Sequence, residues 1–226
     1  MTHPVISLSD VWKVCRVGRA DYPALRGVSM DVKKSEFLCI IGASSSGKST
    51  LLNIMGALDK PTRGEVFFEK SPLSKLSSDK LAELRNRRIG FEFQTFNLIS
   101  HLTAAENVEL PMIALGAPPR KRRERAIEVL SRFLPQSIFS KRSFELSGGE
   151  QQRIAIARAL ANNPDVMLAD EPTGNLDSTN ANLIARIFRE LRDEGRTVVM
   201  VTHNIELTAY AYRIVKLRDG QIVEII

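Results

Sequence analysis

Residues 37–50 read FLCIIGASSSGKST, an apolar run followed by a glycine- and serine-rich turn. The run 37–41 has the length and composition of a buried strand. The turn then opens a helix, and this order of strand, turn and helix is the setting in which GxxxxGK[ST] forms a phosphate-binding loop. A turn that matches the pattern by coincidence is the competing interpretation, and the flanking strand and helix argue against it.

The expected phosphate-binding loop comprises Gly42, Ala43, Ser44, Ser45, Ser46, Gly47, Lys48, Ser49 and Thr50. Backbone N–H groups of such a turn point at phosphate oxygens, and the partial positive charge of the helix N-terminus adds to the attraction. Lys48 is expected to reach the β- and γ-phosphates, and the Ser49 hydroxyl to hold Mg²⁺. The sequence therefore predicts a site for a nucleoside triphosphate.

A second motif supplies carboxylates. Residues 166–171 read VMLADE, an apolar strand that delivers Asp170 and Glu171 at its carboxyl end, where open α/β sheets bind their ligands. Asp170 is expected to act on Mg²⁺, and Glu171 to orient or deprotonate the attacking water. An acidic pair in this place more often forms a turn or a helix cap, but the phosphate loop upstream reverses that preference.

Further apolar runs bounded by turn residues predict buried strands at 66–68, 89–93, 166–169 and 198–202. Helical patterns lie between the strands, after Lys48, over about 78–87 and over about 178–193. Alternation of strand and helix is typical of an α/β fold with a mostly parallel sheet. The opening differs, because 5–17 and 28–32 predict short strands of an antiparallel edge region, joined by a loop over 18–23.

Between Gln94 and Pro164 the strand-like runs give way to helical periodicity at 103–115, 119–133 and 149–161. We therefore expect one domain over 1–226, with an α/β core at 1–93 and 164–226 and an inserted α-helical subdomain at 94–163. The fold class is an α/β P-loop NTPase core with a mostly parallel sheet and an antiparallel β edge subdomain.

Composition excludes several classes of protein. Hydrophobic residues are 43% and charged residues 26% of the chain, as in globular proteins, and no apolar run approaches the roughly 18 residues that cross a bilayer. Without a secretory signal, the chain is expected to be soluble and made in the cytosol. Cys15 and Cys39 have no partner at metal-ligand spacing, so we expect neither zinc nor a disulfide. The net charge of +6 suits nucleic acid, anionic lipid or a phosphate-rich ligand.

Residues 146–153, LSGGEQQR, distinguish among the many enzymes that have a phosphate loop and an acidic strand. Followed by the helical run IAIARALANNP, this segment strongly resembles the signature motif LSGGQ of the ATP-binding-cassette (ABC) ATPases, and the resemblance covers about 5–223. Ser147, Gly148 and Gly149 open a helix and offer a hydroxyl and N–H groups to an anion. The resemblance implies that they bind the γ-phosphate of ATP held by a second copy, in a head-to-tail dimer around two nucleotides.

The same resemblance assigns three further positions. Gln94, in FEFQTFNL, resembles the Q-loop glutamine that senses Mg²⁺ and the γ-phosphate, with an ordinary surface residue as the alternative. Asp177 resembles the D-loop aspartate at the dimer interface and also suits a helix N-cap, and both roles can hold. His203, after TVVMVT, resembles the switch histidine that contacts the γ-phosphate, against a purely structural histidine. The expected catalytic set is Glu171, His203, Lys48 and Gln94, and the expected metal set is Ser49, Gln94 and Asp170.

The chain departs from the family at several positions. Ser45 replaces the usual glycine in the middle of the phosphate loop, and Ser35 replaces a common turn glycine, so both positions are expected to carry some backbone strain. Cys15 lies where the subgroup usually carries a tyrosine that stacks on adenine, a contact of about 1–3 kcal/mol. Tyr22 either replaces that tyrosine or is plain loop surface, and the sequence leaves both open.

The stretches FNLISHLTAAENVELPM and ADEPTGNLDS resemble the ATPases of lipoprotein-releasing, macrolide-exporting and cell-division-type systems. The resemblance implies a cytoplasmic ATPase, peripheral on the inner face of the cell membrane, that drives a separate integral membrane permease. A mechanical partner of a cell-division-type membrane protein shares every motif. A soluble ABC ATPase of DNA repair or translation is disfavoured, because there is one cassette and only about fifty residues separate Gln94 from Leu146.

The basic cluster at 120–123 with Arg125 has two interpretations, a solvated helix face and a surface for membrane or nucleic acid. We favour the solvated face, because Glu124 and Glu128 interrupt the cluster and no aromatic residues interleave with it. Nucleic acid is therefore not an expected partner. This helix and the segment 98–110 are the expected docking surface for the permease.

Overall fold

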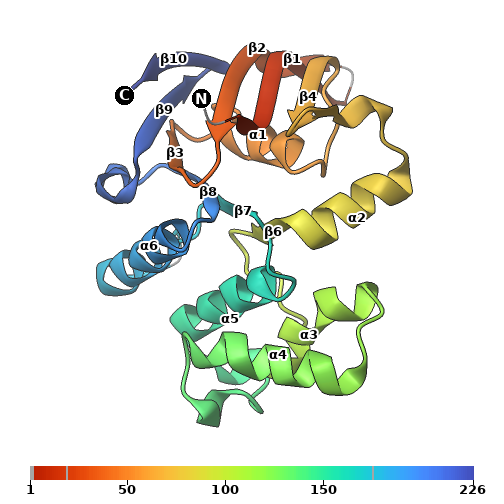
Figure 1. Ribbon diagram of the computed structural model, residues 1–226. Coiled ribbons are helices and arrows are strands. Elements are labelled where there is room, and N and C mark those ends of the chain that lie inside the picture. Colours follow the sequence, from red (N-terminus) through yellow and green to blue (C-terminus); the bar gives the residue numbers. More distant parts are fainter. Residues whose placement is uncertain (1–2, 19, 175) are drawn as a thin grey trace.

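The computed structural model describes residues 3–18, 20–174 and 176–226, and Figure 1 shows two sheets above a group of helices. In this described part, one sheet has six strands in the order β10-β9-β3-β8-β7-β6. The neighbours from β9 to β6 pair in parallel, and β10 joins the edge in antiparallel fashion. The strands are β3 (Phe37–Ile41), β6 (Ile89–Glu92), β7 (Val166–Asp170), β8 (Thr197–Thr202), β9 (Arg213–Arg218) and β10 (Gln221–Ile225). The expected parallel core is therefore confirmed.

The second sheet is antiparallel, in the order β2-β1-β4-β5. Its strands are β1 (Pro4–Val17), β2 (Ala20–Lys33), β4 (Arg63–Phe68) and β5 (Ser71–Pro72). The prediction of a loop over 18–23 is wrong, because pairing continues through Cys15 with Tyr22 and Val14 with Pro23. Proline is tolerated there because β2 is an edge strand and the ladder is irregular at that point.

Three further strands differ from expectation. The run 66–68 lies in the antiparallel sheet and not among the parallel strands, since a short apolar run does not reveal which sheet it joins. The hairpin of β9 and β10 was not foreseen, although Asp219 and Gly220 at its turn both have positive φ, the conformation that an Asp-Gly hairpin turn requires. The turn signal was therefore present in the sequence.

The helices agree closely with the predicted spans. The α-helices are α1 (Lys48–Met55), α2 (Ser78–Arg88), α3 (Ala104–Ala114), α4 (Pro119–Ser131), α5 (Gly148–Leu160) and α6 (Ser178–Asp193). The short 3-10 helices are η1 (Leu73–Lys75), η2 (Gln136–Ile138), η3 (Ser143–Glu145) and η4 (Ile205–Tyr210). Of the helices in the described residues, none combines the length and the apolar character needed to cross a membrane.

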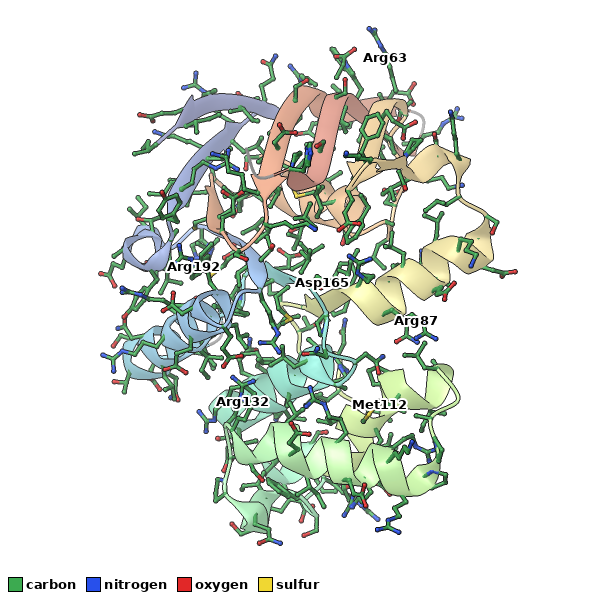
Figure 2. The ribbon with its side chains drawn as sticks, in the orientation of Figure 1. Arg63, Arg87, Met112, Arg132, Asp165 and Arg192 are labelled. Carbon is green, nitrogen blue, oxygen red and sulfur yellow. The ribbon has the colours of Figure 1, made fainter. Side chains whose placement is uncertain are left out.

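Helices α3, α4 and α5 pack on one another to form a group that we call the helical lobe, and α5 also contacts β6 of the parallel sheet (Figure 1). Figure 2 shows the same arrangement, with Arg63 of β4 at one end of the view and Met112 of α3 toward the other. Thr103 caps α3 and Ser147 caps α5, each through a reciprocal capping box closed by a glutamate three residues later.

The core consists of two hydrophobic clusters, one on each face of the parallel sheet. Alternate residues of β3 face opposite ways: Leu38 and Ile40 join the cluster that includes α1 and the antiparallel sheet, while Phe37 and Cys39 join the cluster that includes α6 and the helical lobe. Both faces of the sheet are thus covered, as a parallel sheet requires. The carboxyl ends of β3, β7 and β8 are left to carry the candidate site.

Candidate functional site

The phosphate loop lies between β3 and the first residue of α1. Gly47 has φ +102°, and a Cβ atom at this position would lie 2.4 Å from the carbonyl oxygen of Ala24, so only glycine fits. Ser45 has φ +64°, in the left-handed region, which confirms the strain expected from the loss of glycine. Ser35 also adopts a positive φ, of 57°.

The N-terminus of α1 is open to an anion. It has no side-chain cap and no acidic residue in its first turn. The Ser46 hydroxyl is buried without a hydrogen-bond partner among the described residues. The first N–H groups of a helix have no partner within the helix. Together with the helix dipole and the orphaned Ser46 hydroxyl, they fit the triphosphate of a nucleotide.

Lys48 is buried at this helix start, with 6% of its surface exposed. Its Nζ donates to the carbonyl oxygens of Gly42 at 2.9 Å and Ala43 at 3.0 Å, and it lies 3.6 Å from Oε1 of Glu171. The ammonium is therefore held inside the loop, where phosphate oxygens would be stronger acceptors than the carbonyls.

Asp170, at the end of β7, meets the phosphate loop. Its Oδ1 accepts a hydrogen bond of 2.9 Å from the Ser49 hydroxyl. Burial raises the pKa of Asp170, and the neighbouring charge of Glu171 raises it further. A hydroxyl and a carboxylate are ligands that Mg²⁺ accepts, because this ion uses one or two protein oxygens and completes its shell with phosphates and water. The number of protein ligands is therefore small. In agreement, the described residues contain no cluster of three or more His, Cys, Asp or Glu side chains suited to a metal.

Glu171 lies between Lys48 and His203. It is 8% exposed, and its Oε2 lies 2.9 Å from Nδ1 of His203 and accepts a 3.2 Å hydrogen bond from the His203 backbone N–H. Its φ of +48° is in the left-handed region, a strain that persists only where surrounding contacts fix the residue. Strands β7 and β8 thus bring together the predicted carboxylate and histidine.

Gln94 follows β6, in the segment that leads from the sheet to the helical lobe. A Cβ atom added at Gly174 would lie 3.7 Å from its Nε2. Gly174 closes a turn onto Glu171, donating its N–H to that residue's carbonyl oxygen at 3.0 Å. Gln94 therefore lies beside the Glu171 turn and belongs to the same group of candidate residues.

The signature residues form a second group, at the start of α5. The Ser147 hydroxyl and N–H donate to Oε2 of Glu150 at 2.7 and 2.8 Å, and these bonds lower the pKa of the Glu150 carboxyl. A Cβ atom at Gly149 would lie 2.9 Å from Oδ1 of Asn180 in α6. The signature motif thus packs closely against the start of α6.

Asp177 is the N-cap of α6 and accepts hydrogen bonds from Asn180, from its N–H at 2.9 Å and from its Nδ2 at 2.8 Å. These bonds lower the pKa of Asp177. The capping role expected of Asp177 is confirmed, whereas its interface role stays a prediction, and Asn175 of the same stretch lies outside the described residues. Within the described ranges, no hydrogen bond or ion pair joins Ser147, Gly148, Gly149 or Asp177 to the phosphate loop.

Sequence reasoning missed two charged residues beside the site, one of them buried and the other half-buried. Glu92, at the end of β6, is fully buried, and neither of its carboxylate oxygens has a hydrogen-bond partner in the described structure. Burial raises the pKa of Glu92 to about 8. Arg158 lies in α5 and donates to the segment after Gln94. Each interrupts an otherwise apolar run, and that interruption was the available signal.

The position expected for adenine stacking lies on the β1–β2 ladder. Cys15 is partly exposed and pairs with Tyr22, which is 49% exposed. Tyr22 is a strand residue, so its expected place in a loop is wrong, whereas its side chain does lie at the surface. A stacking role for Tyr22 stays a prediction.

Comparison with known proteins gives concordant results. The profile described as ABC transporter matches residues 25–174. The lipoprotein-releasing system ATP-binding protein LolD of Aquifex aeolicus is 47% identical over 219 residues, which are 97% of this chain and 96% of that protein. The macrolide export ATP-binding/permease protein MacB of Burkholderia pseudomallei is 46% identical over 223 residues, 99% of this chain but 34% of that protein.

A solved structure is also similar. It is the dimeric, post-hydrolysis state of an ATP-binding cassette of Methanocaldococcus jannaschii bound to ADP and Pi. It is 44% identical, covers 98% of this chain and 97% of its own, and superposes with a TM-score of 0.91.

Proposed function

Since this chain belongs to the ABC transporter family and is an ATP-binding, ATP-hydrolysing subunit, we propose that it closes head-to-tail around two Mg-ATP and drives a separate membrane permease. The proposed type is lipoprotein release or export, as in the LolD and MacB systems. The observation that carries the proposal is the division of the candidate residues into two anion-binding groups, between whose phosphate-binding atoms the described part of the chain makes no polar contact. A second copy of the chain is the natural source of the second anion-binding group at each nucleotide.

In the proposed site, the phosphate loop and Lys48 hold the β- and γ-phosphates, while Ser49, Asp170 and Gln94 would hold Mg²⁺. The ion, when bound, would neutralise charge on the phosphate oxygens. Glu171 accepts a proton from the attacking water, and its contacts with Lys48 and His203 fix the carboxylate for that task.

Negative charge develops on the γ-phosphate during hydrolysis. We therefore assign to it the hydrogen-bond donors of the candidate site that do not belong to the phosphate loop. His203 of the same chain reaches it from one side. Ser147, Gly148 and Gly149 of the second copy supply a hydroxyl and helix N–H groups from the other, with Asp177 at the interface. Hydrolysis removes the γ-phosphate that both copies share, and the dimer then reopens.

The permease is proposed to dock at a cleft of about 340 Å³ between the sheet and the helical lobe. Phe91 and Phe93, stacked 5.7 Å apart, and Pro111 give it an apolar wall, and Arg85 and Asn97 give it polar groups. This cleft adjoins the segment after Gln94, so an occupant would sense the nucleotide site. Such docking places the protein on the cytoplasmic face of the membrane.

The expected Arg-rich docking helix fits less well. Arg120 pairs with Glu124, Arg122 and Arg123 pair with Glu109, and Arg125 pairs with Glu128. The arginines are thus neutralised within the lobe, which favours the interpretation as a solvated helix face.

The test begins with Glu171→Gln, which keeps the shape of the side chain and removes the base. Nucleotide binding should persist, phosphate release should stop, and light scattering after gel filtration should show a dimer only with ATP. Hydrolysis at the parent rate would refute the role of Glu171. A monomer in saturating ATP would refute the head-to-tail arrangement.

The permease is tested by trapping tagged Glu171→Gln protein with ATP in detergent-solubilised native membranes and identifying its companions by mass spectrometry. A stoichiometric integral membrane protein with a transported substrate would support the proposal. A division-type membrane protein without one would favour the mechanical alternative. Only soluble or ribosomal companions would refute both.

A further inference from the structure

The segment that follows Gln94 has an unfavourable backbone conformation. Phe96 has φ +57° and Asn97 has φ +49°, two successive residues in the left-handed region. Asparagine tolerates this region better than most residues, whereas phenylalanine does not. Such a conformation persists only where other contacts hold it in place. Within the segment, the Phe96 N–H donates to the Phe93 carbonyl oxygen at 2.9 Å and the Thr95 hydroxyl donates to Oδ1 of Asn97 at 2.9 Å, and contacts from outside the segment add to these.

Arg158 provides those contacts. Its Nη2 donates to the carbonyl oxygen of Phe96 at 2.7 Å, and its Nη1 donates to the carbonyl oxygen of Asn97. The planar guanidinium presents both donors at once, and charged donors make stronger hydrogen bonds than neutral ones. A lysine would carry the same charge but lacks the planar fork in which each of two nitrogens serves one carbonyl.

The helix that carries Arg158 also carries the signature motif. Ser147 caps the start of α5, and Arg158 lies eleven residues later, about 16 Å along the helix axis. The end of α5 near Arg158 packs tightly on β6, because a Cβ atom at Gly90 would lie 2.6 Å from the carbonyl oxygen of Ala159. Asn162, just beyond α5, also donates to the carbonyl oxygen of Asn86 at 3.0 Å.

We infer that Arg158 is a positioning residue for Gln94, and that it ties the placement of Gln94 to the orientation of the signature helix. The inference rests on the proposed function, since the task of Gln94 in hydrolysis belongs to that proposal. A movement of α5 that accompanies capture of the second copy's nucleotide then moves the Gln94 segment with it. In the described structure, the hydrogen bonds of Arg158 go to the backbone of the segment after Gln94 and not to the candidate phosphate-binding or carboxylate side chains, so it acts through Gln94.

A purely structural role is the alternative, and the chain offers a matched control. Arg125 of α4 donates from Nε to the carbonyl oxygen of Ala161 at 3.1 Å and from Nη2 to that of Leu160 at 3.2 Å. It therefore makes the same kind of fork on two successive carbonyls at the same end of α5. Among the described residues, no hydrogen bond or ion pair joins Arg125 to the segment after Gln94, so its loss removes stability without disturbing that segment.

The experiment compares Arg158→Met, Arg158→Lys and Arg125→Met in the full chain, without permease, by thermal melting, ATP affinity and steady-state hydrolysis. Arg158→Met should lower kcat about tenfold with unchanged ATP affinity, because the phosphate loop is intact while Gln94 is displaced. Arg158→Lys should recover part of kcat. Arg125→Met should lower the melting temperature by about as much as Arg158→Met does, and it should leave kcat within about twofold of the parent.

The decisive measurement adds Gln94→Ala. If Arg158 acts through Gln94, Arg158→Met should lower kcat no further in the Gln94→Ala background. Fully additive losses, or an equal loss of kcat in Arg125→Met, would overturn the inference and leave the proposed function standing. A Gln94→Ala variant with the parent kcat would instead refute the role of Gln94 in the proposed function, and the inference with it.

Discussion

Helices α1 and α5 both begin where the proposed mechanism places a phosphate, yet their N-termini are built differently. The start of α1 has Gly47 as its N-cap, no side-chain cap and no acidic residue. The start of α5 is closed by the carboxylate of Glu150, which accepts from the Ser147 N–H and hydroxyl. An uncapped helix N-terminus can bind an external anion without breaking a hydrogen bond. A capped N-terminus must first break the hydrogen bonds to its own capping carboxylate.

The difference indicates an order of events. One chain alone offers ATP a preorganised phosphate loop, so nucleotide binds there first. In the proposed mechanism, the signature motif keeps its internal hydrogen bonds until a triphosphate bound to a second copy competes with Glu150 for Ser147. Dimerisation should therefore be weaker, and easier to modulate, than nucleotide binding.

The largest effect is expected from removing the cation at the open terminus. Lys48→Ala deletes the buried ammonium that phosphate oxygens would contact, and it leaves Glu171 without its neighbouring cation. Phosphate release should fall by about 100-fold or more, and ATP binding by the single chain should weaken strongly. Phosphate-release kinetics and a fluorescent-nucleotide titration measure the two effects. Undiminished binding would mean that the open terminus is not the primary site.

A smaller and different effect is expected at the capped terminus. Ser147→Ala should leave ATP binding by one chain unchanged and weaken the ATP-dependent dimer about tenfold, because a hydrogen bond to a charged group is lost. Sedimentation in the Glu171→Gln background measures the dimer. Thr103→Ala, which removes the equivalent cap of α3, is the control. If that control weakened the dimer equally, general helix stability would explain the effect.

The negative charge of Glu150, which caps the start of α5, gives a third test. Glu150→Gln retains hydrogen-bonding capacity but removes a negative charge from the expected γ-phosphate site, so the ATP-dependent dimer should tighten by about twofold to fivefold. Glu106→Gln makes the same change in the capping box of α3 and should leave dimer affinity as it was. A weaker dimer in Glu150→Gln would contradict competition between this carboxylate and the nucleotide.

Helices α1 and α5 also differ in the residues that they cover, and this difference is expected to affect turnover least. Helix α5 covers β6 and its buried Glu92, near Gln152, Arg158 and Asp170, whereas α1 packs on apolar residues. The pKa of Glu92 is about 8 in the folded chain and near 4.5 when unfolded. Between about pH 5 and pH 8 the folded state keeps a proton that the unfolded state has lost, so the free energy of unfolding falls as pH rises.

Glu92→Gln should therefore flatten this dependence, by about 1 kcal/mol for each pH unit across that window. Denaturant midpoints of parent and variant at several pH values measure it. The exposed Glu124→Gln variant is the control and should keep the parent slope. Equal slopes in the parent and Glu92→Gln would show that Glu92 is ionised in the folded chain at neutral pH.

Local patterns were enough to predict the parts of the site that are contiguous in the chain. The phosphate loop, the end of β7 and the start of α5 each show their chemistry within about ten residues, because turn formation, capping and strand burial are short-range effects. The same short range explains why the helices lie close to their predicted spans. Hence the candidate nucleotide site and the candidate second anion site could both be named from the sequence.

Tertiary packing decided what joins those parts. It extended β1 and β2 into a long hairpin, placed β4 in the antiparallel sheet, and set Glu171 between Lys48 and His203. It also brought Arg158 to the carbonyls of Phe96 and Asn97, about sixty residues away in the chain. Such contacts depend on which surfaces bury each other across the whole core, and no local pattern contains that information. The chemistry of each residue is therefore readable in order along the sequence, whereas its partners are set only when the two hydrophobic clusters close.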